Sequence, residues 1–247
     1  MLTWILLFVL SSAEAREAQA YAPDLTRPET KAEAQLDVLE GLVRGGLTAD
    51  ALKVSAQLRA EGMKGARFDI LQAEVMHATG LTSQALDMLR AVTRKEPKNA
   101  AAWAMLGIVL SDHQETEEAV AALERARRLT PDDAAVLNNL GYLQMARGQN
   151  QRAVDLFEQA IIQDPSSLRS RNNLGFAFAR LEKDMDALAA FRSASSESDA
   201  RYNMGVACEL RGDTTSALTN YQAAVAANAQ HSSARTALAR LLHTESP

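Results

Sequence analysis

A two-residue motif, alanine followed by leucine or valine, recurs along this chain at a nearly fixed interval and constrains its fold more than any other feature. The first five copies are spaced 34 residues apart, and the sixth follows after 30 residues. The motif begins at Ala51, Ala85, Ala119, Ala153, Ala187 and Ala217. A constant period of this length predicts a repeat architecture, in which each unit buries its apolar face against its neighbours.

Other residue types keep step with the motif. A glycine precedes it by 12 residues in four units, at Gly107, Gly141, Gly175 and Gly205. A large apolar residue follows it by four residues, at Leu89, Leu123, Phe157, Phe191 and Tyr221. Three units end at a proline, which is Pro97, Pro131 or Pro165. We infer that each glycine lets two helices of one unit approach closely, which offsets its low helix propensity.

Each unit is predicted to form two amphipathic helices of about 14 residues joined by a turn. Turn glycines stand at Gly46, Gly80, Gly148 and Gly212, and capping residues follow two of the prolines at Asp132–Asp133 and Ser166–Ser167. The composition agrees, because 47% of the residues are hydrophobic but only 5% are aromatic, which favours an all-helical soluble protein. The shorter interval before the sixth unit predicts residues lost from the second helix of the fifth unit or from the linker after it.

The pattern resembles the tetratricopeptide repeat (TPR), a 34-residue helical hairpin. The fullest match is the third unit, with Trp103, Leu106, Gly107, Leu110, Ala119, Leu123, Ala126 and Pro131. The resemblance implies an all-α solenoid of about six repeats over residues 32–229, wound into a right-handed superhelix. A capping helix and tail at residues 230–247 would end it. The first unit matches least well, because Leu39 stands at the glycine position and Ser55 at the large apolar position.

Residues 1–20 are similar to a secretory signal peptide. The apolar run Leu2–Leu10 is too short to span a bilayer, and two small-residue patterns that suit cleavage follow it, Ala13-Glu14-Ala15 and Ala18-Gln19-Ala20. We therefore expect an exported protein, periplasmic or associated with the outer membrane, with a linker over residues 21–31. The alternatives are an uncleaved short membrane tether, or a misplaced start codon in a cytoplasmic protein. No lipobox cysteine follows the run, because Ala13 stands there, so lipid attachment at that site is not expected.

The residues that carry most enzyme chemistry are scattered. None of the four histidines stands at metal-ligand spacing with another histidine or with the single cysteine, Cys208, and no phosphate-binding loop or hydrolase motif occurs. Cys208 occupies a large apolar position of the sixth repeat, where we expect a core residue. The net charge is −5 without a basic run, which disfavours nucleic acid as a partner. We therefore expect no enzyme activity, no cofactor and no metal.

Recognition of a protein or peptide remains, and in a TPR the first helices of the repeats line the concave groove. The groove positions of the last three repeats carry carboxamides, aromatic residues and arginines, which suit an extended peptide. They are Asn138, Asn139, Tyr142 and Met145, then Arg169, Asn172, Asn173, Phe176 and Arg180, then Tyr202, Asn203 and Val206. We expect Asn139, Asn173 and Asn203, at equivalent positions, to form a row of amides that contacts the partner. The alternative is that these asparagines serve only the fold.

An exported six-repeat protein is similar to the bacterial TPR proteins of pilus and secretion machines, the pilotins of type IV pili and the TPR component of Tad (Flp) pilus systems. The stretches that carry this resemblance are "RNNLGFAFARLEKDMDALAAF" and "ARYNMGVACELRGD". It implies an assembly scaffold that holds a pilus or secretin subunit. Two further hypotheses are a regulatory adaptor of an envelope enzyme and a cytosolic TPR adaptor.

Overall fold

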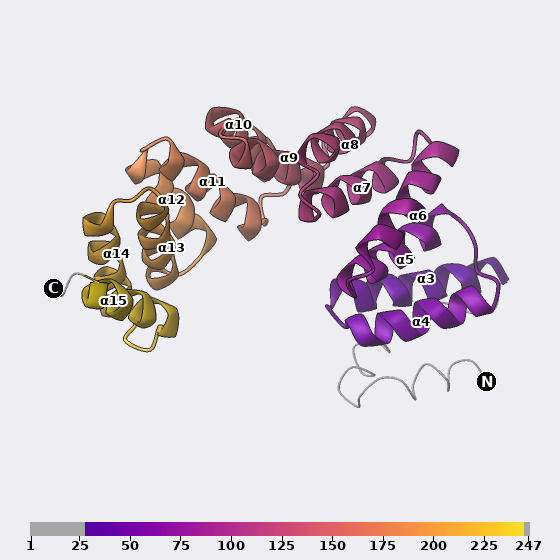
Figure 1. Cartoon of the computed structure of the whole chain (residues 1–247), viewed down its shortest axis with the longest axis horizontal. Helices are drawn as coiled ribbons and strands as arrows, with labels where there is room; N and C mark the ends of the chain where they lie inside the picture. Colours follow the sequence, from indigo (N-terminus) through magenta and orange to yellow (C-terminus); the bar gives the residue numbers. More distant parts are fainter. Residues whose placement is uncertain (1–27, 245–247) are drawn as a thin grey trace. The chain divides into compact units, whose positions relative to one another are not determined.

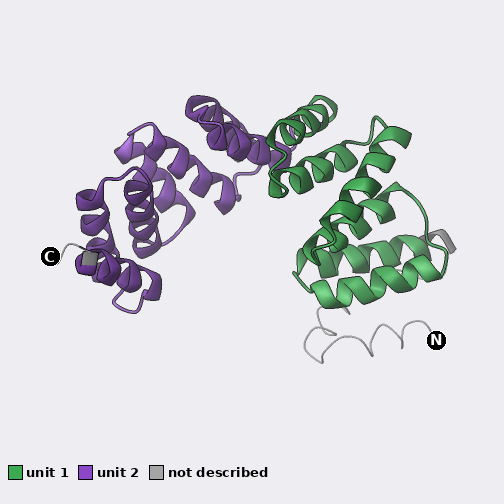
Figure 2. Ribbon diagram, in the orientation of Figure 1, with its two compact units in different colours: residues 1–129 green, residues 130–247 purple. Residues whose placement is uncertain are grey.

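The computed structural model describes residues 28–244, and within them every regular element is a helix (Figure 1). The chain divides into two compact units, residues 1–129 and 130–247 (Figure 2). In each unit consecutive helices pair as hairpins, and the first helices of neighbouring hairpins also touch one another. This is the all-α helical-repeat fold that the 34-residue period predicts. The expected signal peptide, residues 1–20, lies outside the described residues.

The described part of unit 1, residues 28–129, contains three helical hairpins. Their helices are α3 (Pro28–Arg44), α4 (Thr48–Ala60), α5 (Ala66–Ala78), α6 (Thr82–Lys95), α7 (Ala100–Asp112) and α8 (Thr116–Leu129). The first two hairpins share an apolar cluster in which Leu39, Leu58 and Phe68 are buried. Burial of such side chains between hairpins is what holds repeats together, because one hairpin cannot cover its own apolar face.

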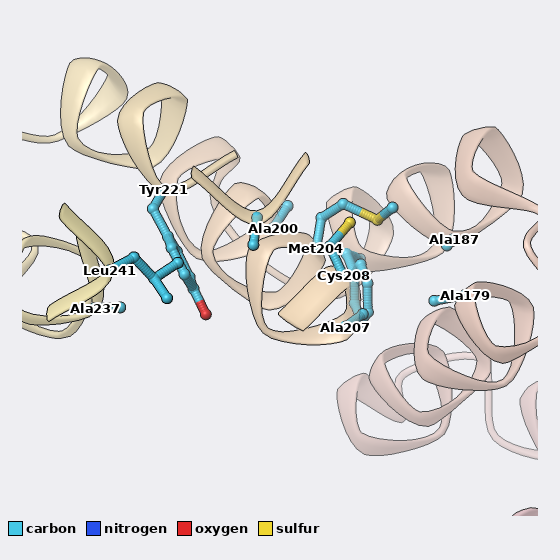
Figure 3. Close-up of a cluster of buried hydrophobic side chains, with 11 residues drawn as sticks. Ala179, Ala187, Ala200, Met204, Ala207, Cys208, Tyr221, Ala237 and Leu241 are labelled. Atoms are coloured by element: carbon cyan, nitrogen blue, oxygen red, sulfur yellow. The ribbon is translucent and has the colours of Figure 1, made fainter. Parts of the chain in front are cut away.

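Residues 130–244 of unit 2 form three further hairpins followed by one single helix. Its helices are α9 (Ala134–Ala146), α10 (Asn150–Gln163), α11 (Leu168–Arg180), α12 (Asp184–Ala194), α13 (Glu197–Leu210), α14 (Thr214–Ala227) and α15 (Ser232–Thr244). A buried cluster runs from α11 to α15 and includes Met204, Tyr221 and Leu241 (Figure 3). Cys208 is buried in this cluster, so the prediction that it is a core residue is confirmed.

Helix α3 begins earlier than the sequence pattern indicates. Its first residue is Pro28, so residues 28–31, which we expected to be linker, are helical. Proline suits this place because its fixed φ matches the helix and its missing N–H would have no intrahelical partner there. The linker boundary predicted at residue 31 is therefore wrong.

The repeat glycines lie where the two helices of a hairpin approach most closely. A Cβ atom added to Gly141 would stand 2.6 Å from the ring of Phe157, and one added to Gly175 would stand 2.5 Å from the ring of Phe191. Gly107 and Gly205 are blocked in the same way by Leu123 and Tyr221. The close-approach explanation of these glycines is confirmed.

The turns inside the hairpins require a left-handed backbone conformation. Four are made by the predicted glycines, Gly46, Gly80, Gly148 and Gly212, with φ between 69° and 85°. The third and fifth hairpins place Gln114 (φ 64°) and Glu182 (φ 60°) at the equivalent position. A side chain makes this conformation unfavourable by roughly 1–2 kcal/mol. These two turns are therefore strained where the other four are not.

The shortened interval before the sixth unit removes residues from both predicted places. Helix α12 has 11 residues where α10 and α14 have 14, and only residues 195–196 separate it from α13. Across this connection the Nε and Nη2 atoms of Arg192 donate hydrogen bonds to the two carboxylate oxygens of Glu197, at 2.6 and 2.7 Å. Arg201 donates a third bond to Glu197 at 3.0 Å. These bonds, chiefly those from Arg192, lower the pKa of Glu197 to about 2.

Replacing Glu182 by glycine should stabilise the protein. Glycine adopts the left-handed conformation without strain, but it also gains entropy in the unfolded chain, so we expect a net rise of about 0.5 kcal/mol in the free energy of unfolding. Urea denaturation measures this change. Gly148→Ala, at φ 74°, is the reverse control and should destabilise by about 1 kcal/mol. A Glu182→Gly variant less stable than the wild type would contradict the explanation.

Replacing Glu197 by glutamine should destabilise the protein at neutral pH. Arg192 and Glu197 are exposed and Arg201 is half-buried, so solvent screens the ion pairs and the expected loss is about 0.5 kcal/mol. Because folding lowers the pKa of Glu197, its stabilisation is present above its ordinary pKa and is lost as the pH falls towards about 2. The difference between variant and wild type, measured by urea denaturation, should therefore shrink on acidification. Glu158→Gln, an exposed position on α10, should show no such change, and a difference that stayed constant down to low pH would rule out the ion pair as its cause.

Candidate partner-binding face

All the predicted groove residues lie on three first helices of unit 2, namely α9, α11 and α13. Helix α11 touches both α9 and α13 directly, so side chains on facing turns can meet. Asn138, Asn172 and Tyr202 stand at equivalent positions of their repeats, and Asn139, Asn173 and Asn203 stand one residue later. The sequence spacing thus places these side chains together, as expected.

The asparagines pair diagonally between neighbouring helices. The Nδ2 atom of Asn173 donates to Oδ1 of Asn138 at 3.0 Å, and Nδ2 of Asn203 donates to Oδ1 of Asn172 at 2.8 Å. Each bond joins the asparagine at the first of these two positions in one repeat to the asparagine at the second position in the next repeat. The expected row of equivalent amides therefore forms as two separate pairs, which fix the stacking of α9, α11 and α13.

Asn139 differs from the other asparagines because it has no hydrogen-bond partner among residues 28–244. In the third repeat the residue that corresponds to Asn138 is Ala104. Tyr142, one turn further along α9, is 52% exposed. Both side chains are available to a partner.

Arg169 is also available. It is exposed on the first turn of α11, one turn before Asn173, and it forms no ion pair within the described part of the chain. Tyr142 lies one turn after Asn138 on α9, so Arg169 and Tyr142 flank the first asparagine pair. We call the surface formed by Asn139, Tyr142, Arg169 and the two asparagine pairs the carboxamide face.

Several predicted contact residues hold the repeats together. Asn138 and Met145 are only 5% and 8% exposed, so the prediction that they face a partner is wrong. Asn138 is covered because it accepts the bond from Asn173, and Met145 because it packs in a cluster with Phe157. The Nη1 atom of Arg180 donates to the backbone oxygen of Met145 at 2.7 Å, which anchors α11 to the end of α9.

The aromatic residues of the predicted set are also engaged in packing. Phe176 meets Phe191 edge to face, with ring centroids 4.9 Å apart. The ring of Tyr202 is close to the rings of Tyr221 and His231, with centroids 5.8 and 5.1 Å away. Val206 is half-buried against the same cluster. These three residues support the carboxamide face from one end and leave part of each side chain accessible.

A charged network connects this end of unit 2 to α15. Glu209 accepts hydrogen bonds from the hydroxyl of Tyr221 at 2.9 Å and from Arg240 of α15 at 2.7 Å. Burial opposes the charged form of Glu209, but the bonds from Arg240 and Tyr221 outweigh it and lower the pKa. Burial and the bond to Glu209 together raise the pKa of Tyr221. Because Arg240 belongs to α15, the final helix is bonded to α13.

Two glutamines were missed by the sequence analysis. Gln144 on α9 is fully buried, and neither polar atom of its side chain has a partner in the described chain. Gln72 on α5 is 8% exposed. The sequence could have identified both glutamines, because each departs from the repeat pattern. Gln144 stands where other repeats have a large apolar residue, Leu110 or Phe178. Gln72 stands where other repeats have a leucine, Leu106 or Leu140.

Metal binding and membrane insertion can both be judged for residues 28–244. No group of three or more His, Cys, Asp or Glu side chains in this part of the chain is arranged to hold a metal ion. None of its helices combines the length and the apolar character needed to cross a bilayer.

Two solved structures show the same fold. YrrB, described as a TPR protein with an unusual peptide-binding site, has a TM-score of 0.55 at 20% identity, and the match covers 74% of this chain and 96% of YrrB. MamA has a TM-score of 0.55 at 18% identity, covering 65% of this chain and 96% of MamA. A search of the curated proteins gave no match.

The sequence also matches a known family model. Residues 66–203, more than half of the chain, match the model described as the cytochrome c-type biogenesis protein H TPR domain. The matched span runs from the start of α5 into α13, so it includes the whole carboxamide face. Proteins of TPR fold are scaffolds for protein interactions. The chain belongs to the TPR family defined by the cytochrome c-type biogenesis protein H domain.

Proposed function

We propose that the protein is a non-catalytic adaptor whose carboxamide face holds an extended segment of a partner protein. The observation that carries the proposal is the contrast between Asn139 and the paired asparagines. Asn138 with Asn173, and Asn172 with Asn203, hold the helices together, whereas Asn139 has a carboxamide with both polar atoms unused. A free carboxamide can donate to and accept from one peptide group of a bound segment.

The neighbours of Asn139 suit the rest of such a segment. Tyr142 offers an aromatic surface at low entropic cost, because its side chain has only two rotatable bonds. Arg169 offers five donors and a positive charge, which suits a carboxylate or a backbone carbonyl. Fixed asparagine pairs between these groups keep the helices in place, so binding needs little ordering of the surface.

Two classes of partner follow from different observations. The family match favours a component of cytochrome c biogenesis, while the resemblance to Tad components and pilotins favours a pilus or secretin subunit in the bacterial envelope. Export through the signal peptide at residues 1–20 belongs to the same proposal, and a regulatory role towards an envelope enzyme is the remaining alternative. A photo-crosslinking amino acid at Tyr142, followed by mass spectrometry, would name the partner and the bound segment. An intact Met1 on a cytosolic protein would contradict export.

The double variant Asn139→Ala with Tyr142→Ala should weaken binding of the crosslinked segment, supplied as a peptide, by about tenfold or more. Its free energy of unfolding should change by less than about 0.5 kcal/mol, because neither side chain is buried in the core. Isothermal titration and urea denaturation measure the two quantities. Gln159→Ala, an exposed position on α10, is the matched control for binding.

The single variant Asn173→Ala separates the two roles of asparagine. It breaks the bond to Asn138 and should lower the free energy of unfolding by about 1 kcal/mol.

Unchanged affinity of the double variant Asn139→Ala with Tyr142→Ala would show that the carboxamide face is not the binding surface.

A further inference from the structure

The second helices of the second and third repeats, α6 and α8, end in basic residues. Residues 94–99 and 125–129 contain six basic residues but a single acidic one, Glu96, although the whole chain has a net charge of −5. These segments are the end of α6 with the loop after it and the end of α8, all within unit 1 (Figure 2). Local positive charge in an acidic chain indicates a surface for an anionic partner.

Two contacts show that α6 and α8 run side by side in the same direction. Nη2 of Arg90 on α6 donates to Oε2 of Glu118 on α8 at 3.1 Å. Nη2 of Arg125 on α8 donates to the backbone oxygen of Pro97, just after α6, at 3.3 Å. Both contacts join residues that are 28 positions apart in the sequence. Because this spacing is the same at both ends, the C-terminal ends of α6 and α8 lie at one edge of unit 1.

Five basic side chains lie at this edge, which we call the basic edge. They are Arg94, Lys95, Lys98, Arg125 and Arg128. Arg125 is half-buried and the other four are exposed. None of the five forms an ion pair within residues 28–244. Arg127 is not included, because it stands two residues after Arg125 and projects from another side of α8.

The helix dipole accounts for only part of this charge, although it favours a basic residue near a helix C-terminus. The last turn of α4 carries Arg59, which is paired with Asp69 at 2.7 Å. The last turn of α12 carries Arg192, which is paired with Glu197 at 2.6 Å. Helices α10 and α14 have no basic residue in their last turn. Among the second helices in residues 28–244, unpaired positive charge at the C-terminal end is therefore confined to α6 and α8.

An amphipathic aromatic residue lies next to these charges. Trp103 on α7 is half-buried, and its Nε1–H donates to the backbone oxygen of Pro97 at 3.1 Å. The same oxygen accepts the bond from Arg125, and Pro97 itself is exposed. Tryptophan is enriched at membrane–water interfaces, because its ring is apolar and its N–H is polar. The basic edge thus places cations beside a residue type that suits such an interface.

We propose that the basic edge binds the anionic phospholipid headgroups of a membrane surface. A bilayer presents many phosphates in one plane and requires no fixed geometry from each cation, which suits five long side chains without carboxylate partners. Each lysine or arginine close to such a surface strengthens binding about fivefold. The acidic remainder of the chain is repelled by the same phosphates, so the charge asymmetry orients the protein with this edge towards the membrane.

The apolar run at Leu2–Leu10 favours a membrane over an acidic polypeptide as the partner. The run is too short to span a bilayer, and a single weak apolar anchor gives only reversible attachment. A second signal, such as a basic patch, makes attachment stable. The basic edge goes beyond the function proposed for the carboxamide face and shares no residue with it, so either proposal can fail without the other.

The test uses the full chain and two kinds of lipid vesicle. Vesicles of phosphatidylcholine with about one-third phosphatidylglycerol should bind at least about twentyfold more tightly than vesicles of phosphatidylcholine alone. Co-sedimentation measures this binding. Residues 2–10 are present in both arms, so the comparison isolates the effect of lipid charge. Raising the salt concentration to about 0.5 M should remove most of the difference, because salt screens the attraction.

The double variant Lys95→Gln with Lys98→Gln should weaken binding to the anionic vesicles about twentyfold. Both side chains are exposed, so the variant should fold, which thermal melting checks. Lys183→Gln with Arg235→Gln is the matched control, because it removes two positive charges from exposed positions of unit 2. The control should weaken binding by less than about threefold.

Three results would overturn the proposal. One is equal binding to the two kinds of vesicle. Another is an equal loss in the Lys95 and Lys98 variant and in its control, which would show a general effect of net charge. The third is tighter binding of a polyglutamate peptide than of the anionic vesicles at the same concentration of negative charge, which would make an acidic polypeptide the partner.

Discussion

The structure depends on the contact between the two helices of each hairpin, where one small residue faces one large residue. Gly141 and Gly175 leave room for the rings of Phe157 and Phe191. The second repeat has Ala73 and Leu89 at these two positions, and the first has Leu39 and Ser55, all of them buried. In the first repeat the large residue is Leu39 on the first helix, and the small residue is Ser55 on the second helix. The two residues are therefore still complementary in size. Close packing explains this exchange, because interiors tolerate neither a void nor an overlap.

The sequence predicted the features that arise inside one hairpin. The period located the helices, and the close-approach glycines and the caps Asp133 and Ser167 occur as expected. Features that depend on contacts between neighbouring hairpins were predicted less well. The asparagine pairs run between adjacent positions of successive repeats, because neighbouring helices are offset by one residue at that point. The polar role of Gln72 was not predicted, because a repeat consensus identifies the positions that match it. Its hydrogen-bond partner, Arg59, lies on the preceding hairpin.

The two candidate sites show how a repeat protein can gain binding surfaces without changing its fold. On the carboxamide face the same residue type is structural where it pairs with another asparagine, and available at Asn139, which has no partner in the described part of the chain. In unit 1 the last turns of α6 and α8 carry basic residues, whereas those of α10 and α14 carry none. Both sites arise at positions that lie outside the repeat consensus. In a repeat array such positions are free to serve binding, because the consensus positions are needed for packing.

The most direct measurement is a double-mutant cycle between Gly141 and Phe157, followed by urea denaturation. Without a steric conflict, Gly141→Ala would stabilise a helix interior by about 1 kcal/mol. The added Cβ meets the buried ring, so we expect a loss of about 2 kcal/mol instead. In a Phe157→Leu background, which imitates Ala73 with Leu89, the same change should cost at least about 1 kcal/mol less. Additive effects, or a stabilising Gly141→Ala, would show that hairpin packing does not depend on this pair.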